Sequence, residues 1–193
     1  MKKLKAVVLG AAFAAALGLG MGTNSVDASE VEGTSVGSQY HNKIIAISSM
    51  DVGMSGIFQG FVTWNTANDD VLMNLSMFAP SKTQEWAFFY TASDDTYQIM
   101  SGPISIDGWL RAGYLSAGPT DSNGNPNVSA TGSFASQKWR VDKVGTQNGS
   151  DVAILKNVST GKVLDLTSTN DLILYNQNGG SNQHFVMNVL RDA

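Results

Sequence analysis

Three copies of the pattern Gln-x-aromatic constrain this chain more than any other feature of its sequence. They are Gln84-Glu85-Trp86, Gln137-Lys138-Trp139 and Gln183-His184-Phe185. Hydrophobic residues follow each copy, and the successive aromatic residues are 53 and 46 positions apart. A unit of this length cannot bury its apolar face alone, so neighbouring units must supply the rest of the core. The repeat therefore predicts three units around a common axis, with the aromatic side chains in a shared core.

The rest of the sequence predicts an all-β domain. After residue 28 no segment keeps a 3.6-residue apolar period, whereas short runs rich in Val, Ile, Leu and aromatic residues alternate with Gly, Asn, Asp and Ser. The predicted strands are 43–48, 57–63, 71–76, 85–90, 96–100, 138–143, 151–155, 163–166, 172–175 and 184–189. Segment 117–127, with two Pro and two Gly, is predicted to be a loop. This spacing favours a closed or nearly closed barrel.

The N-terminal segment is typical of a secretory signal peptide. Three lysines precede an apolar run from Ala6 to Gly22, and small residues end at Ala28. We expect cleavage after Ala28, a flexible leader over 29–39, a single domain over 40–193, and secretion of the chain. The alternative interpretation is a membrane anchor, since the run approaches the length of a spanning helix. No second apolar run of that length follows.

Composition excludes several classes of function. Without residues 1–28 the chain keeps 9 basic and 15 acidic residues, which disfavours nucleic acid and anionic lipid as partners. The absence of cysteine excludes thiol catalysis and thiolate metal sites. His41 and His184, the two histidines, lie far apart in sequence and suggest neither a metal site nor a catalytic triad. We therefore expect no cofactor and no metal.

The threefold Gln-x-aromatic pattern resembles the ricin-B-type (QxW) β-trefoil lectin family, most clearly over residues 96–190. The resemblance implies three four-stranded repeats with pseudo-threefold symmetry, and carbohydrate binding in shallow surface pockets. It also implies that Trp86, Trp139 and Phe185 lie in the core, with Gln84 and Gln137 as structural hydrogen-bonding residues. In its short third unit the chain is similar to compact members such as the clostridial haemagglutinin components.

The sugar pocket of that family combines a carboxylate, an aromatic ring and an amide. By position these groups fall on Asp165, Tyr175 and Asn182, with Gln183 behind them and Gln177 beside the ring. A carboxylate and an amide suit the two adjacent hydroxyls of a sugar, and a flat ring suits its apolar face. The alternative is that each residue has an ordinary strand or turn role. Only nine residues separate the carboxylate from the ring, which predicts a shortened pocket wall.

The other two units lack these groups. In the second, Tyr114-Leu115-Ser116 is expected at the carboxylate strand and Val128-Ser129-Ala130 at the ring position. In the first, Ile45-Ala46-Ile47 and Leu72-Met73-Asn74 are expected there. The sequence therefore predicts at most one carbohydrate site, in the third unit.

Two other functions remain to be compared with a lectin that binds glycans on cell surfaces or glycoproteins. One is a non-catalytic delivery or structural subunit of a secreted toxin complex, which would bind a companion protein through apolar residues such as Met50, Met54, Ile57, Phe58 and Phe61. The other is an enzyme. The paired carboxylates Asp69-Asp70 and Asp94-Asp95 stand in turn sequences and not across a cleft, so no catalytic residues are predicted.

Overall fold

The computed structural model describes residues 32–50, 58–77, 80–106 and 108–193. These residues form 14 strands and three short 3₁₀ helices, so the predicted all-β class is confirmed. The predicted signal peptide lies outside the described residues, as do Met54 and Ile57. Within the described part of the chain, no helix has the length and apolar character needed to cross a membrane.

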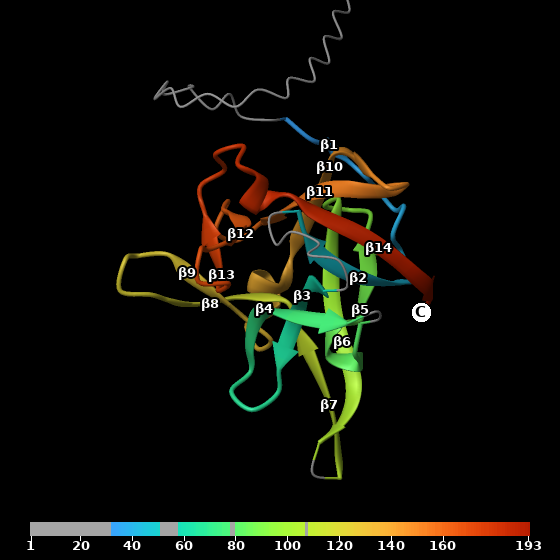
Figure 1. Cartoon of the computed structure of the whole chain (residues 1–193), viewed down its shortest axis with the longest axis vertical. Helices are drawn as coiled ribbons and strands as arrows, with labels where there is room; N and C mark the ends of the chain where they lie inside the picture. The colour runs from blue at the N-terminus through green and yellow to red at the C-terminus, as the bar shows by residue number, and fades with distance from the viewer. Residues whose placement is uncertain (1–31, 51–57, 78–79, 107) are drawn as a thin grey trace, which may run out of the picture.

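The strands group into three sets of four with two additions (Figure 1). The first set is β2 (Lys43–Ser49), β3 (Phe58–Asn65), β4 (Asp70–Met77) and β5 (Trp86–Thr91). The second is β6 (Thr96–Ile106), β8 (Ser116–Thr120), β9 (Pro126–Ser129) and β10 (Trp139–Gln147). The third is β11 (Ser150–Asn157), β12 (Val163–Leu166), β13 (Leu172–Tyr175) and β14 (Phe185–Asp192). The additions are β1 (Thr34–Ser35) and β7 (Trp109–Tyr114).

The first and last strands of each set build a closed ring. Antiparallel pairing runs from β2 through β5, β6, β10, β11 and β14 and back to β2. The two middle strands of each set form a hairpin, and the three hairpins meet through pairing of β9 with both β4 and β13 and through a bridge between Leu72 and Asp171. A closed ring leaves no free sheet edge, and the hairpins cover one end of it.

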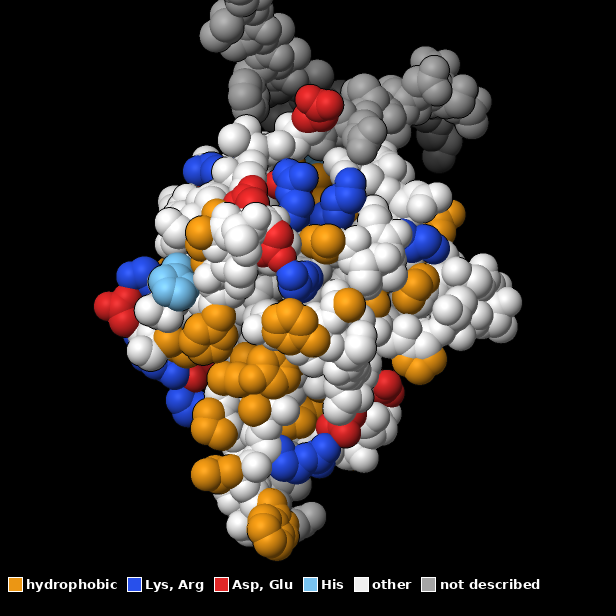
Figure 2. Space-filling view, turned by 180° about the vertical axis from the view of Figure 1, so that it is seen from behind, with side chains coloured by type: hydrophobic (Ala, Val, Ile, Leu, Met, Phe, Trp, Pro, Cys, Tyr) orange, Lys and Arg blue, Asp and Glu red, His pale blue; other side chains and the backbone are white. Residues whose placement is uncertain are grey.

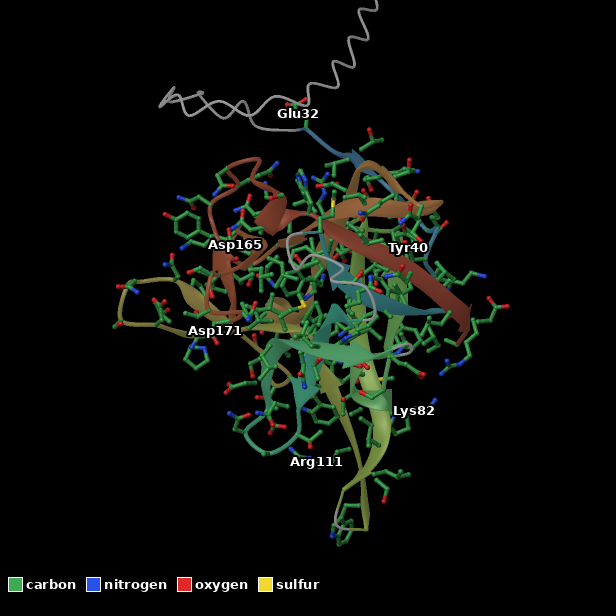
Figure 3. The ribbon with its side chains drawn as sticks, in the orientation of Figure 1. Glu32, Tyr40, Lys82, Arg111, Asp165 and Asp171 are labelled. Carbon is green, nitrogen blue, oxygen red and sulfur yellow. The ribbon has the colours of Figure 1, made fainter. Side chains whose placement is uncertain are left out.

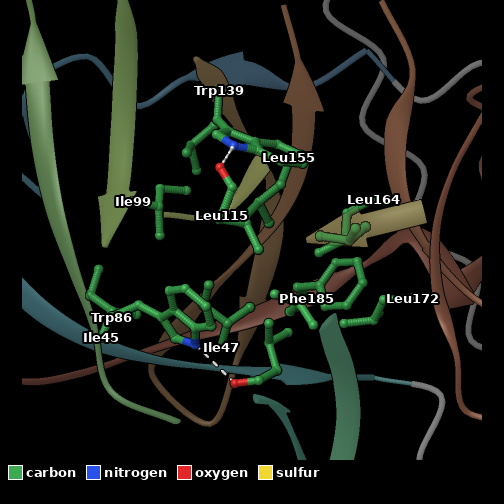
Figure 4. Close-up of a cluster of buried hydrophobic side chains, with 14 of the residues drawn as sticks. Ile45, Ile47, Trp86, Ile99, Leu115, Trp139, Leu155, Leu164, Leu172 and Phe185 are labelled. Carbon is green, nitrogen blue, oxygen red and sulfur yellow. Dashed lines mark hydrogen bonds between the residues drawn. The ribbon is translucent and has the colours of Figure 1, made fainter. Parts of the chain in front are cut away.

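The aromatic residues of the three repeats lie in one core, as predicted (Figure 4). Trp86, Trp139 and Phe185 are each 0% exposed. The two indole N–H groups donate to the backbone carbonyl oxygens of Val62 at 2.9 Å and Leu115 at 2.7 Å. A buried indole N–H needs such an acceptor, so these bonds fix β3 against β5 in the first set, and the residue before β8 against β10 in the second.

The glutamine of each Gln-x-aromatic copy also has a structural role. A 3₁₀ helix precedes each aromatic strand: η1 (Lys82–Gln84), η2 (Phe134–Gln137) and η3 (Ser181–Gln183). Gln84 Oε1 accepts from the backbone N–H of Ser81 at 2.8 Å, and Gln137 Nε2 donates to the carbonyl oxygen of Gly132 at 3.0 Å. Each glutamine thus satisfies backbone groups of the loop before it, which confirms the predicted role of Gln84 and Gln137.

Two segments differ from their sequence-based description. Segment 117–127, predicted to be a loop, contributes to β8 and β9, and only its tip is a turn, closed by Asp121 accepting from the backbone N–H groups of Asn123 and Asn125. Part of the predicted leader 29–39 forms β1, in which Thr34 and Ser35 pair with Lys143 and Asp142 of β10. Tertiary pairing decides both cases, since neither segment has a strand-like sequence.

Candidate functional site

The β12–β13 hairpin of the third repeat positions the predicted carboxylate and ring. In its register Leu164 lies opposite Leu174, and both are 0% exposed in the core. Asp165 and Tyr175 therefore lie on the other face, because successive side chains of a strand alternate. Asp165 pairs with Ile173, which places Tyr175 at the neighbouring diagonal position, roughly 7–8 Å away between backbones. Figure 3 shows Asp165 on this hairpin, beside the loop that leads to η3.

Two amides from the end of that loop hold the Asp165 carboxylate. Asn182 Nδ2 donates to Oδ1 at 2.9 Å, and Gln183 Nε2 donates to Oδ2 at 2.7 Å. Asn182 Nδ2 also lies 3.4 Å from the carbonyl oxygen of Leu166. Asp165 is 5% exposed, so these bonds compensate for much of the hydration that its carboxylate loses. The two amides thus orient the carboxylate on the hairpin face that also carries Tyr175.

Gln183 supports this arrangement from inside. It is 0% exposed, and its Nε2 also donates to the carbonyl oxygen of Asn176 at 3.0 Å. Its Oε1 accepts from the backbone N–H of Asn178 at 2.9 Å. Both the nitrogen and the oxygen of the Gln183 side-chain amide thus bond to the protein. Gln183 thereby fixes the loop between β13 and η3. In this structure it lies behind the surface that a ligand could touch.

Two of the predicted residues, Tyr175 and Asn182, lie at the surface of this site. Gln177, between them in sequence, lies elsewhere. Tyr175 is 43% exposed, and Asn182 is partly exposed. Gly180 leaves room for the Asn182 amide, because a Cβ on Gly180 would lie 2.4 Å from Asn182 Oδ1. Gln177 lines a different hollow of about 250 Å³, together with Arg140 and other polar residues of β10 and β11. The structure therefore groups Asp165, Tyr175 and Asn182, and places Gln177 toward another surface.

The other two repeats carry a hydroxyl where the third carries Asp165. The residues whose carbonyls accept the indole N–H groups, Val62 and Leu115, occupy equivalent positions in the first two repeats. The residues that follow them are Thr63 and Ser116. Both are buried, at 6% and 0% exposure. The equivalents of Asp165 are therefore Thr63 and Ser116.

The hydrogen bonds of these residues support the equivalence. The hydroxyls of Thr63 and Ser116 each donate to the carbonyl oxygen two residues earlier, at 2.8 and 2.6 Å. Gln84 Nε2 lies 3.1 Å from Thr63 Oγ1, just as the glutamine of the third repeat contacts Asp165. The same glutamine position therefore contacts a hydroxyl in the first repeat and a carboxylate in the third.

Our sequence-based correspondences for this position are therefore wrong in detail. In the second repeat the predicted Leu115 is one residue too early, and in the first repeat the predicted Ala46 lies on β2, a strand of the ring. The register also places Asn74 of β4 opposite Phe61, where Tyr175 stands in the third repeat. In the first repeat this position and that of Asp165 thus carry neither ring nor carboxylate, and in the second repeat the position of Asp165 carries the hydroxyl of Ser116.

A larger hollow, which the sequence did not reveal, lies beside this site. It measures about 500 Å³ and is lined by residues of all three hairpins, including Ile173, which pairs with Asp165. Its polar groups include the carboxylates of Asp70, Asp121 and Asp171. Of these, only Asp70 was considered from the sequence, as a turn residue. Among the described residues, no group of three or more His, Cys, Asp or Glu side chains is arranged to hold a metal ion.

His184, the middle residue of the third Gln-x-aromatic copy, provides a test of this part of the fold. Its Nε2 is buried and has no hydrogen-bond partner, and burial lowers the pKa of the imidazole below its usual 6.5. The unfolded chain consequently binds more protons than the folded chain below about pH 6.5. We expect the free energy of unfolding to fall between pH 6.5 and 5, by at most about 1.4 kcal/mol per pH unit from this group.

Denaturant unfolding at several pH values measures this slope, with His184→Gln expected to reduce it and His41→Gln as the matched control. The acidic groups Glu85 and Asp94 do not interfere. Hydrogen bonds from Arg191 and Lys138 lower the pKa of their carboxyls, so their contributions are lost only at more acidic pH. An unchanged slope in His184→Gln would show that this imidazole is not buried in its neutral form.

Comparisons with known proteins identify the fold. No protein-family model matches the sequence, and no curated protein does. Among solved structures, the BEL β-trefoil is similar over 78% of this chain and 94% of its own, with a TM-score of 0.55 and 13% identity. A mosquitocidal holotoxin matches 78% of this chain, with a TM-score of 0.55 and 18% identity. A GlcNAcα1-4Gal-releasing endo-β-galactosidase from Clostridium perfringens matches 77%, with a TM-score of 0.52 and 14% identity.

The likeness covers only a part of two of these proteins. The match spans 18% of the holotoxin chain and 33% of the galactosidase chain, against nearly all of the BEL β-trefoil. At these identities the likeness shows the fold alone. The chain is nearly all β and shares the β-trefoil fold of these neighbours.

Proposed function

We propose that this chain is a secreted, non-catalytic carbohydrate-binding protein of the ricin-B type, with one sugar site in its third repeat. The observation that carries the proposal is the Asp165 carboxylate, which two amides orient on the same hairpin face as an exposed tyrosine ring. Secretion follows from the signal-like segment 1–28. The partners are glycans on cell surfaces or on glycoproteins.

The chemistry of the site matches that of a sugar. In this proposal the Asp165 carboxylate and the Oδ1 of Asn182 beside it accept hydrogen bonds from adjacent sugar hydroxyls. The ring of Tyr175 packs against the apolar C–H face of the pyranose. Because Asn182 and Gln183 already orient the carboxylate, little side-chain freedom is lost on binding.

The site is small, and its affinity is correspondingly low. A single shallow site of this kind has a dissociation constant on the order of 1 mM, about −4 kcal/mol. Polar residues of the neighbouring 500 Å³ hollow, such as Thr167 and Asp171, extend the surface along which a second sugar of an oligosaccharide would lie. Binding in a biological setting then relies on avidity, through clustered glycans or several copies of the protein.

The structural neighbours are consistent with a trefoil that binds a carbohydrate. The match to the galactosidase spans a third of that chain, and the match to the holotoxin spans less than a fifth. In both proteins a β-trefoil is therefore part of a larger chain. The name of one of them, the galactosidase, refers to a carbohydrate. These neighbours support a binding role for the trefoil.

A glycan array probed with residues 29–193 tests the proposal. We expect a signal on particular glycans that falls at least about tenfold in Tyr175→Ala, because the sugar loses the surface on which it packs. The matched control is Phe134→Ala, which removes another exposed aromatic ring, on η2. Absence of any glycan signal for the native chain, or equal losses in both variants, would contradict the proposed site.

A second candidate function is a non-catalytic subunit of a secreted toxin complex that acts through protein contacts. The likeness to part of a holotoxin favours it. The apolar residues first considered for this contact are divided in the structure: Phe61 is buried, whereas Met50 is 38% exposed. This function predicts no glycan signal, so the same array separates the two candidates.

A further inference from the structure

The hairpin formed by β6 and β7 carries the two most exposed large apolar side chains among the described residues. Trp109 is 77% exposed and Leu110 is 76% exposed. The hairpin extends away from the ring of strands, at the lower end of the molecule in Figure 1. Figure 2 shows hydrophobic side chains at the same end of the molecule, beyond the body of the protein. An exposed apolar cluster at a projecting tip indicates a contact surface.

Both faces of this tip are available. Trp109 and Leu110 are consecutive in β7, so their side chains point to opposite faces of the two-stranded ribbon. They lie opposite Ile106 and Ser105 of β6, respectively. Since both are largely exposed, neither face of the ribbon rests on the protein. A flat partner would cover only one face, whereas an apolar medium entered by the tip would cover both.

The base of the hairpin is fixed to the body of the protein. Both carboxylate oxygens of Asp69 accept from Arg111 Nη2 at 2.8 Å, and the guanidinium lies 5.8 Å from the centre of the Trp64 ring. Gly113 packs so closely that a Cβ there would lie 2.8 Å from Ala130 Cβ. Figure 3 shows Arg111 near the base of the hairpin. These contacts hold the tip in its projecting position, so little order has to be gained on binding.

Charge and area point to the kind of partner. Arg111 is the one charged side chain among the described residues of the tip, 102–105 and 108–112, and Asp69 neutralises it. The chain is acidic overall, which opposes anionic lipids. A stable protein interface needs roughly 20 residues from each partner, far more than the tip offers. Tryptophan, with its apolar ring and polar N–H, prefers the boundary between lipid and water.

We propose that the β6–β7 tip inserts into the lipid–water boundary of a zwitterionic membrane, with Trp109 and Leu110 as the inserted side chains. The proposal does not depend on the sugar site, which is on the third repeat. Where both operate, lipid contact adds to the avidity of glycan binding on a cell surface.

Tryptophan fluorescence with brominated lipid tests the proposal. Residues 29–193, which include every described element, are titrated with sugar-free phosphatidylcholine vesicles that carry bromine on their acyl chains. Of the four tryptophans, Trp64, Trp86 and Trp139 are buried, so quenching by bromine reports Trp109. We expect saturable quenching of the native chain, and none with the same vesicles lacking bromine.

The matched variants are Leu110→Ser and Leu75→Ser, which change exposed leucines at the tip and on β4. Leu110→Ser keeps the reporter and is expected to need about tenfold more lipid for half-maximal quenching. Leu75→Ser is expected to match the native chain, and both should unfold at the native temperature. Unquenched native fluorescence, or equal lipid requirements for the two variants, would overturn the proposal.

Discussion

Replacing Trp139 with alanine is expected to lower the free energy of unfolding by about 3–5 kcal/mol, enough to unfold many domains of this size. The side chain is 0% exposed in the shared core, and its indole N–H donates to the carbonyl oxygen of Leu115 at 2.7 Å. Alanine leaves a cavity and a buried carbonyl without its donor. Denaturant unfolding followed by circular dichroism measures the loss.

Trp139→Phe is the matched control, since Phe185 already occupies the corresponding place in the third repeat. This variant keeps most of the buried ring and loses the hydrogen bond, so we expect a loss of about 2 kcal/mol. A loss below about 1 kcal/mol for Trp139→Ala, or equal losses for the two variants, would contradict a core built on the three aromatic side chains.

The second large effect is on binding. Asp165→Thr is expected to weaken sugar binding at least about tenfold, because it removes the carboxylate that accepts from the sugar hydroxyls. Its effect on stability should stay within about 1 kcal/mol. The reason is that Thr63 stands at the same place in the first repeat, where Gln84 lies 3.1 Å from its hydroxyl. Sugar titration and denaturant unfolding of the same preparation measure both quantities.

Asp165→Leu separates charge from hydrogen bonding. It leaves the amides of Asn182 and Gln183 without their acceptor, so we expect a loss of about 2–3 kcal/mol in stability. Binding is lost in both variants, whereas stability is lost mainly in the leucine variant. If Asp165→Thr bound sugar as the native chain does, the carboxylate would have no part in recognition.

Much of the fold was predictable because its signals are local. Short apolar runs separated by turn residues marked ten of the strands, and the Gln-x-aromatic copies marked Trp86, Trp139 and Phe185 as core. Of the four strands that were not predicted, β8 and β9 contain Pro, Gly or Asn, which indicate a turn. They exist because β9 pairs with β4 and β13, and no local pattern reports such pairing.

The candidate site was predictable only in its third repeat. Asp165 and Asn182 do contact each other at 2.9 Å, 17 residues apart. The equivalent positions Thr63 and Ser116 were not found, because the equivalence rests on an indole-to-carbonyl bond between residues 24 apart. The exposure of Trp109 was also hidden in the sequence, where an aromatic strand residue is more often buried.

The most direct test of a single site in the third repeat is the backbone amide NMR spectrum of residues 29–193, recorded during titration with a sugar identified on the array. The largest shifts should occur at residues 163–166, 172–176 and 180–183, while the amides of Thr63 and Ser116 stay unchanged. Shifts concentrated around Thr63 and Ser116, or spread equally over the three repeats, would contradict the account.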